Sequence, residues 1–149
     1  MRILSAVLIL LLISAGCSSR VDEVPDTVEQ GTPEERSAVA KAAKTFLDRL
    51  DEGKVDETWA ESSPVLATYT DRNAWALGIR AIRSTVGNLQ NRELREVWLH
   101  SAVADSPPGE YATLIVETEF SHAKVQEKVI LNKHEGTWKI SGYYLVKHL

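Results

Sequence analysis

Two different spacings of apolar residues divide most of the chain. Residues 32–87 carry apolar positions at helical spacing, where every third or fourth residue falls on one face. Residues 92–147 carry them mostly at every second position, which is typical of strands with one buried face. Because the helical part comes first and the strands follow with short turns, the pattern predicts an α+β domain with an antiparallel sheet.

The first predicted helix begins at Thr32 and ends at Gly53. The segment Thr32-Pro33-Glu34-Glu35 supplies a capping threonine, a proline at the first helical position and a glutamate three residues after the cap. Glycine is common just past a helix end. The face expected to be buried consists of Val39, Ala42, Ala43, Phe46, Leu47 and Leu50.

Two further helices are predicted before the strands. The second covers about residues 55–62, and Ser63-Pro64 ends it. The third begins near Thr70 or Asp71 and stops before Gly87. Gly78 lies in its middle, where glycine costs about 1 kcal/mol relative to alanine, so we expect close contact with another backbone there.

Four strands are predicted, at about residues 92–104, 111–120, 124–133 and 138–147. In the first, alternation places Val97 and Leu99 on one face and Leu94 on the other. In the last strand, it places Tyr143 and Leu145 on one face. The other face carries Trp138, Ile140, Gly142, Tyr144 and Val146.

The three helices are the available cover for the apolar face of this sheet. We therefore expect three N-terminal helices packed on a curved four-stranded antiparallel sheet. A sheet curled around the long first helix would form a cone with an open end. Residues 32–149 would make up this single α+β domain.

The first 17 residues form a different pattern. Arg2 precedes an apolar stretch at residues 3–13, and the small residues 14–16 lead into Cys17. This is the layout of an export signal, and the stretch is shorter than the roughly 20 residues that span a bilayer as a helix. Residues 1–16 are predicted to be a signal peptide, and residues 17–31, which show no helical or strand period, a lipidated N-terminus with a flexible tether.

Charge and cysteine content narrow the classes of partner. The chain has 17 basic and 21 acidic residues, a net charge of −4, and loss of Arg2 with the signal peptide makes it −5. Nucleic-acid binding favours a basic face, so this balance argues against such a partner. With one cysteine, the fold cannot depend on internal disulfides. We expect no cofactor and no metal site.

Ser14-Ala15-Gly16-Cys17 resembles the lipobox of bacterial lipoproteins. Ala15 and Gly16 fit that motif, whereas Ser14 stands where the family usually has leucine, valine or isoleucine. The resemblance implies a diacylglyceryl group on Cys17, cleavage before it and acylation of the new N-terminus, and two or more acyl chains give stable anchoring. The alternative is an ordinary signal peptide with Cys17 as a free thiol.

The lipoprotein resemblance also implies a location. The protein would be exported to the cell envelope and held there by lipid. Ser18, rather than aspartate, follows the cysteine. In Gram-negative relatives this favours the outer membrane facing the periplasm, although the type of envelope is not given by the sequence.

A second resemblance covers residues 36–147 and is carried by scattered residues, namely Phe46-Leu47, Asp51-Glu52-Gly53-Lys54, Trp59, Trp75, Arg83, Gly87, Arg92, Pro108-Gly109-Glu110-Tyr111, Glu127, Gly136-Thr137-Trp138 and Ser141-Gly142-Tyr143. They resemble the bacterial domain-of-unknown-function 4019 family and, more broadly, the nuclear-transport-factor-two-like superfamily. The resemblance implies the cone-shaped fold and brings no assigned activity. Superfamily members often pair through the open sheet face, so a homodimer is compatible with it.

Candidate pocket residues are Trp59, Trp75, Arg83, Glu127 and Tyr143. Tryptophans at these spacings are also typical of plain core. Arg83 could bind an anion inside the cone, but we favour an ion pair with Glu127 that fixes the helix–sheet register. If a dimer forms, the outer face of the last strand, with Tyr143 and Leu145, is where we expect contact.

The sequence carries no reaction motif. Among the histidines only His100 falls within a predicted strand, and no aspartate does, so an acid–base pair inside the cone is not expected and no catalytic residue is predicted. We predict a non-catalytic, membrane-anchored envelope lipoprotein that binds a small ligand or a protein partner. The alternative is a small-molecule isomerase, dehydratase or hydrolase that uses the cone pocket, which rests on fold analogy.

Overall fold

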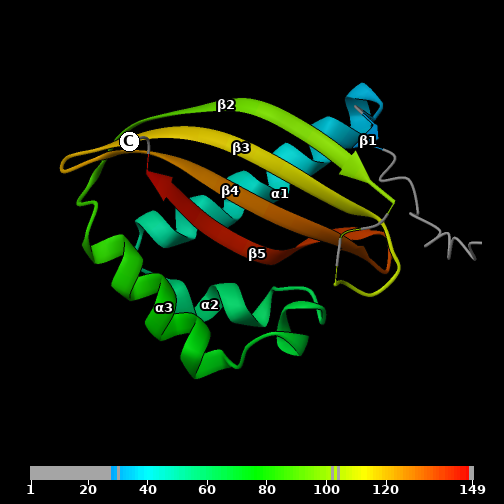
Figure 1. The fold of residues 1–149 in the computed structure, drawn as a ribbon, viewed down its shortest axis with the longest axis horizontal. Helices are drawn as coiled ribbons and strands as arrows, with labels where there is room; N and C mark the ends of the chain where they lie inside the picture. The colour runs from blue at the N-terminus through cyan, green and yellow to red at the C-terminus, as the bar shows by residue number, and fades with distance from the viewer. Residues whose placement is uncertain (1–27, 30, 102, 104, 148–149) are drawn as a thin grey trace, which may run out of the picture.

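The computed structural model of the chain describes residues 28–29, 31–101, 103 and 105–147. The predicted signal peptide, Cys17 and most of the tether lie outside these residues. The elements in order are β1 (Val28–Glu29), α1 (Pro33–Asp51), α2 (Val55–Ala60), the 3-10 turn η1 (Leu66–Thr68), α3 (Arg72–Ser84), β2 (Leu89–His100), β3 (Tyr111–Phe120), β4 (Lys124–His134) and β5 (Thr137–Lys147) (Figure 1). Helices followed by antiparallel strands confirm the α+β prediction.

The sheet has the strand order β1-β2-β3-β4-β5, and each neighbouring pair is antiparallel. Its four long strands were predicted, whereas β1 was not. Val28 pairs with His100 and Glu29 with Leu99, within the segment predicted as a tether. Two residues are too few to show an alternating period, so the sequence pattern could not reveal this strand.

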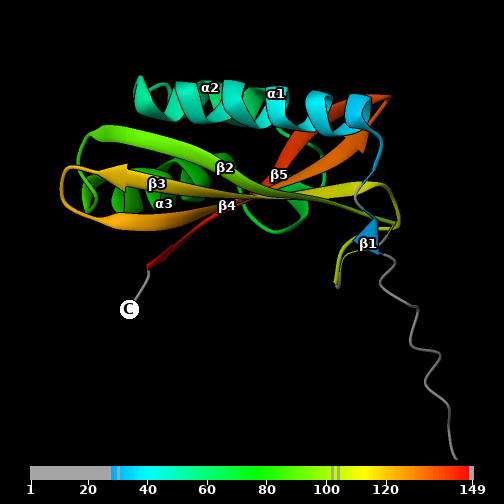
Figure 2. The same cartoon turned by 90° about the horizontal axis from the view of Figure 1, so that it is seen from above.

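Helix α1 begins with the predicted capping box. The Thr32 hydroxyl accepts a hydrogen bond from the Glu35 backbone N–H at 3.2 Å, and the Glu35 carboxylate accepts one from the Thr32 N–H at 2.9 Å. The helix lies along one face of the sheet (Figure 2). Its buried residues join the apolar side chains of β2–β5 in one core; they are Val39, Ala43, Phe46, Leu47 and Leu50.

Helices α2 and α3 lie beside β5 at one edge of the sheet (Figure 1). Asp71 caps α3, and its carboxylate accepts hydrogen bonds from two backbone N–H groups of the first turn. The Trp75 indole N–H donates to the Thr58 hydroxyl at 3.0 Å and joins α3 to α2. The Ser63 N–H donates to the Ile140 carbonyl at 2.7 Å, which ties the segment before η1 to β5.

A bulge in β5 corrects the predicted facing of its second half. Ile140 pairs with Leu131 and Gly142 with Ile130, so Ser141 is an extra residue. Beyond it, Tyr143 turns toward the core and is 5% exposed, while Tyr144 is 55% exposed. The prediction that Tyr143 and Leu145 face outward was therefore wrong, because one inserted residue exchanges the two faces.

Strand β2 contains a second bulge of the same kind. Leu94 pairs with Val116 and Glu96 with Ile115, which leaves Arg95 as the extra residue. Leu94 and Val97 therefore share the inner face of the sheet, whereas the plain alternation placed them on opposite faces. The strand also begins at Leu89 and ends at His100, earlier at both ends than predicted.

The expectation for Gly78 was wrong as well. A Cβ added at this position would meet nothing within 4 Å, so no neighbouring backbone approaches it.

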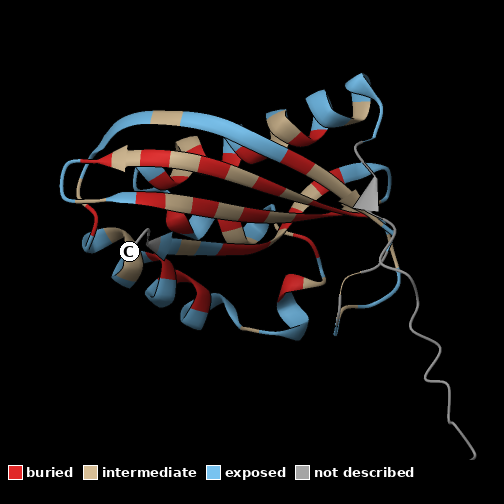
Figure 3. Ribbon diagram, turned by 45° about the horizontal axis from the view of Figure 1, so that its top comes forward, coloured by how far each residue is buried: buried red, intermediate tan, exposed pale blue. Residues whose placement is uncertain are grey.

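The buried residues lie on one face of each element. Figure 3 shows the inner stripes of the helices and alternate positions of β3 and β4 buried. Within the described part of the chain, no helix has both the length and the hydropathy to cross a membrane.

Candidate functional site

A buried carboxylate lies at the centre of the inner sheet face. Glu127 on β4 is 0% exposed. Its Oε1 accepts hydrogen bonds from Arg92 Nε at 2.8 Å and from the Thr118 hydroxyl at 2.5 Å. Its Oε2 accepts one from the Tyr143 hydroxyl at 2.5 Å and one from Arg83 Nη1 at 3.4 Å. Each oxygen of this carboxylate thus has two donors.

Asp51, the last residue of α1, supplies a second carboxylate to the same network. It accepts hydrogen bonds from Arg92 Nη1 at 2.6 Å and Nη2 at 3.2 Å, and it pairs with Arg83. The side chains of Arg83, Arg92 and Asp51 are 13%, 15% and 17% exposed. The Arg83 guanidinium also lies 4.7 Å from the centre of the Phe120 ring.

Six elements contribute one side chain each to this network, which we call the Glu127 cluster. Two arginines balance two carboxylates, so its formal charge is zero. Removal of one partner from such a buried set typically costs about 3–5 kcal/mol, because it leaves a charge uncompensated. The cluster therefore fixes the register of α1 and α3 on the sheet. Its members are Asp51, Arg83, Arg92, Thr118, Glu127 and Tyr143.

The cluster also determines the protonation of its tyrosine. Burial, the charge of Glu127 and the hydrogen bond to it raise the pKa of Tyr143 far above its ordinary value. Tyr143 therefore stays protonated and acts as a hydrogen-bond donor. For Arg92, burial lowers the pKa, but the bonds to Asp51 and the charge of Glu127 outweigh it and raise the pKa overall.

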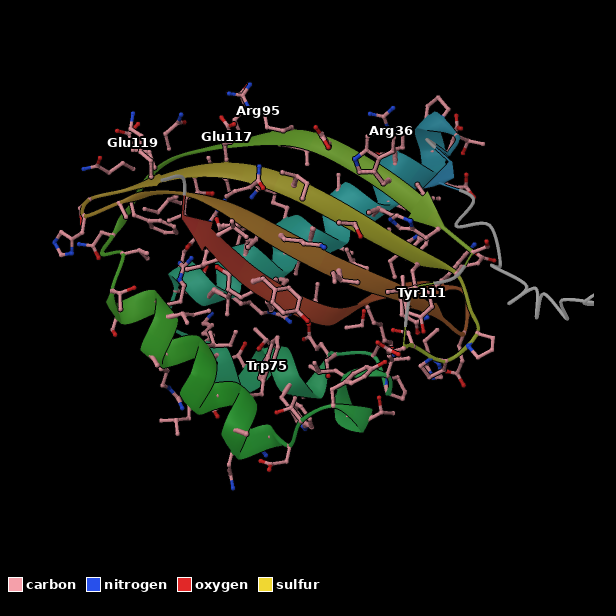
Figure 4. All side chains as sticks on the ribbon, in the orientation of Figure 1. Arg36, Trp75, Arg95, Tyr111, Glu117 and Glu119 are labelled. Atoms are coloured by element: carbon pink, nitrogen blue, oxygen red, sulfur yellow. The ribbon has the colours of Figure 1, made fainter. Side chains whose placement is uncertain are left out.

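A groove of about 570 Å³ opens between α3, η1 and the second half of β5; we call it the α3–β5 groove. Trp75, which lines it, lies in the space between α3 and β5 (Figure 4). Ala74 and Gly78 leave room on the helix side, and residues 141–145 form the strand side. None of the described residues that line it is an aspartate, glutamate, lysine, arginine or histidine.

Ser141, the bulge residue, lines this groove. Its hydroxyl oxygen is buried and makes no hydrogen bond within the described part of the chain. A buried hydroxyl without a partner costs about 1–3 kcal/mol, so natural structures rarely keep one without a reason. The groove thus combines apolar walls with one buried polar group that has no partner among the described residues.

Tyr143 connects the groove to the Glu127 cluster. Its ring lines the groove while its hydroxyl bonds to Glu127. The ring also packs edge-on against Phe46 with centroids 5.4 Å apart, and Phe46 lies 6.3 Å from Trp75. Phe46, Trp75 and Tyr143 belong to one hydrophobic core, so the aromatic wall of the groove is continuous with that core.

A family model matches residues 42–143 of the chain, and its description is Protein of unknown function (DUF4019). The chain belongs to the DUF4019 family. The match includes every member of the Glu127 cluster and most of the groove. Comparison with curated proteins and with solved structures found no match.

The residues predicted for a pocket separate into three places in this DUF4019 domain. Trp75 and Tyr143 line the α3–β5 groove. Arg83 and Glu127 belong to the buried cluster, where the ion pair predicted between them is confirmed at 3.4 Å. Trp59 is half-buried, packs against the core and is not among the residues that line the groove.

Four residues of the DUF4019 site had no role assigned from the sequence. They are Asp51, Arg92, Thr118 and Ser141. Asp51 could have been recognised by its place in the last turn of α1, where the helix dipole disfavours a negative charge. The bulge at Arg95 hid the inward facing of Arg92, and Ser141 is itself the extra residue of the bulge in β5. Among the described residues, no group of three histidine, cysteine, aspartate or glutamate side chains could hold a metal ion.

Proposed function

We propose that this DUF4019 protein is a non-catalytic, lipid-anchored protein of the bacterial cell envelope that binds a small ligand in the α3–β5 groove. The observation that carries the proposal is the pairing of apolar walls with the Ser141 hydroxyl, which has no partner in the described part of the chain. Ligand sites commonly measure about 300–1,000 Å³ and combine apolar walls with a few polar groups that fix orientation. The groove matches this description.

The Glu127 cluster supports binding rather than catalysis. A general base needs a free lone pair that faces the substrate, whereas each oxygen of Glu127 already accepts two hydrogen bonds. The raised pKa of Tyr143 also opposes its action as a base near neutral pH. The cluster is therefore best explained as the support that holds the Tyr143 side of the groove.

The cone of the nuclear-transport-factor-two-like superfamily belongs to this proposal as its finer description of the fold. The position of α1 along one face of the sheet supports it (Figure 2). The N-terminal anchor rests on the lipobox-like segment that ends at Cys17. Growth with labelled palmitate should label the wild-type protein and leave Cys17→Ser unlabelled; an unlabelled wild type would contradict the anchor.

A matched pair of substitutions on α3 tests the groove. Ala74 lines it, whereas Ala81 is exposed on the same helix and does not. The full-length lipoprotein in phospholipid nanodiscs is irradiated with a photoreactive dodecanol, and labelled peptides are identified by mass spectrometry. We expect Ala74→Trp to reduce labelling of residues 141–145 at least about tenfold, because an indole fills the groove. Ala81→Trp should label like the wild type, and equal labelling of both variants would contradict the proposal.

The alternative of a small-molecule isomerase, dehydratase or hydrolase is favoured by one observation. Tyr143 lines the groove with its ring and bonds through its hydroxyl to a buried carboxylate, so one side chain connects the groove with a titratable group. Mass spectrometry of the ligand that co-purifies with the protein separates the two functions. A ligand changed by the wild type and left intact by Tyr143→Phe would identify an enzyme, and a ligand left intact by both supports binding.

A further inference from the structure

The charge distribution around the α3–β5 groove limits what can occupy it. Of the described residues that line it, none is an aspartate, glutamate, lysine, arginine or histidine. Apart from the Trp75 indole N–H, which bonds to Thr58, their polar side-chain groups are hydroxyls of serine, threonine and tyrosine. A charged group moved from water into such a site is left without a partner of opposite charge, which strongly disfavours it. The walls thus select against both anions and cations.

The nearest buried charges do not change this conclusion. They belong to the Glu127 cluster behind Tyr143, where Arg83 and Arg92 are matched by Asp51 and Glu127. The cluster carries no formal net charge, and its carboxylates are held by arginine and hydroxyl donors. Tyr143 directs its hydroxyl toward Glu127 and presents its ring to the groove.

Ser141 determines which polar group a ligand of the groove must carry. Its buried hydroxyl can donate one hydrogen bond and accept others, and it has no partner within the described residues. A hydroxyl or a carbonyl on the ligand would satisfy it once rotation about χ1 turns the Ser141 hydroxyl from its buried position into the groove. The surrounding walls, such as Ile79, Ile82 and Leu145, provide contact for a hydrocarbon body.

We infer that the α3–β5 groove takes an uncharged amphiphile, a hydrocarbon body that carries a hydroxyl or carbonyl group, with that group bonded to Ser141. This inference rests on the proposed function and assigns the class of ligand. A fatty alcohol or a monoacylglycerol has this chemistry, whereas a free fatty acid at neutral pH does not. The inference excludes an acidic or basic head group at the serine end of the groove.

Three photoreactive probes of equal chain length test the inference. The probes are a dodecanol, a dodecanoate and a dodecyl-trimethylammonium, each with a diazirine at the same carbon, applied at pH 8 to the full-length lipoprotein in nanodiscs. Groove labelling is the labelling of residues 141–145 in the wild type minus that in Ala74→Trp, which removes the contribution of probe dissolved in the bilayer. We expect groove labelling by the alcohol to exceed that by either charged probe at least about tenfold.

Ser141→Ala provides the second readout. Loss of one neutral hydrogen bond should reduce groove labelling by the alcohol about two- to tenfold and leave labelling by the charged probes unchanged. Ser101→Ala is a control substitution in a residue that does not line the groove. An undiminished signal in Ser141→Ala would contradict the assignment of the polar group.

The outcomes separate this inference from the function on which it rests. If labelling depends on Ala74 but charged and neutral probes label equally, the groove binds ligands and the selectivity for uncharged ones is wrong. If none of the probes gives groove labelling, the proposed function fails as well. Native mass spectrometry that shows a dimer in the wild type and a monomer in Ala74→Trp would identify a second copy as the occupant, and it would overturn the inference.

Discussion

Replacement of Glu127 by glutamine tests the central contact of the domain. The amide has the size of the carboxylate but can accept at only one of its two ends. At the other end its NH₂ would face two donors, either Arg92 and Thr118 or Tyr143 and Arg83. The substitution therefore removes two hydrogen bonds and leaves two arginines against the single charge of Asp51.

The magnitude follows from these losses. A hydrogen bond to a charged group contributes about 1.5–3 kcal/mol, and loss of one partner from a buried ion pair costs about 3–5 kcal/mol. We expect the free energy of unfolding to fall by about 3–5 kcal/mol for Glu127→Gln, out of a total near 5–15 kcal/mol for a typical domain. The melting temperature should fall by roughly 10–20 °C.

Equilibrium unfolding in urea, followed by tryptophan fluorescence, measures the change. Glu117→Gln is the matched control, because Glu117 pairs with Arg95 on the exposed side of the sheet and lies away from α3 (Figure 4). This control should alter stability little, since exposed ion pairs contribute little. In Glu127→Gln/Arg92→Met the loss should be smaller than the sum of the single losses, because the second change removes the uncompensated charge.

A loss below about 1 kcal/mol for Glu127→Gln would refute the reasoning, because such a value is expected for a solvated pair. Additive losses in the double variant would refute the claim that the two groups act on one another. Either result would mean that packing of the apolar core, rather than the Glu127 cluster, holds α1 and α3 in register on the sheet.

Two further predictions concern backbone and pH. Gly78→Ala should raise the free energy of unfolding by about 0.5–1 kcal/mol, because the new Cβ meets open space, whereas Gly87→Ala should lower it, because its φ of +82° and the nearby Ser121 hydroxyl leave no room. Urea unfolding of the two variants checks this pair, and a destabilised Gly78→Ala would contradict it. Burial beside Glu127 raises the pKa of Tyr143 in the folded state, so its contribution to stability is complete below the unfolded pKa near 10 and is lost as pH rises above that value. Stability of the wild type should therefore fall between about pH 9.5 and 11.5 more steeply than that of Tyr143→Phe, and equal slopes would contradict the assignment.

The elements could be predicted from the sequence because their signals are local. The capping box at Thr32 and the alternating residues of β3 depend on neighbours a few positions away, and both predictions are confirmed. The contacts of Gly78 could not be predicted, because they depend on which face of α3 meets another element. The ion pair of Arg83 with Glu127, which was favoured over an anion bound inside the cone, is confirmed.

Alternation could not predict which residues of the two bulged strands, β2 and β5, face the core. One extra residue exchanges the faces of all that follow, and neither Arg95 nor Ser141 differs in type from an ordinary strand residue. As a result Tyr143 was expected outside, although it completes the hydrogen bonds of Glu127. A bulge is recognised from the pairing register with the neighbouring strand. The pattern of residues in a single strand does not contain that register.

Deletion of Ser141 tests why the bulge exists. Without it Ile140 still faces Leu131, Gly142 still faces Ile130, and Tyr143 still faces inward, so the strand would alternate without interruption. The fold thus does not require the extra residue. Its loss also removes a hydroxyl that has no partner within the residues the structure describes, a burial that costs about 1–3 kcal/mol. We expect the deletion variant to remain folded with the Glu127 cluster intact, and to lose labelling by the photoreactive dodecanol in the groove.

Deletion of Lys139, which lies before the bulge, should instead unfold the protein or displace Trp138, because the faces of the strand would then be exchanged. A Ser141 deletion that folds and still labels like the wild type would show that the bulge serves the curvature of β5 rather than the ligand.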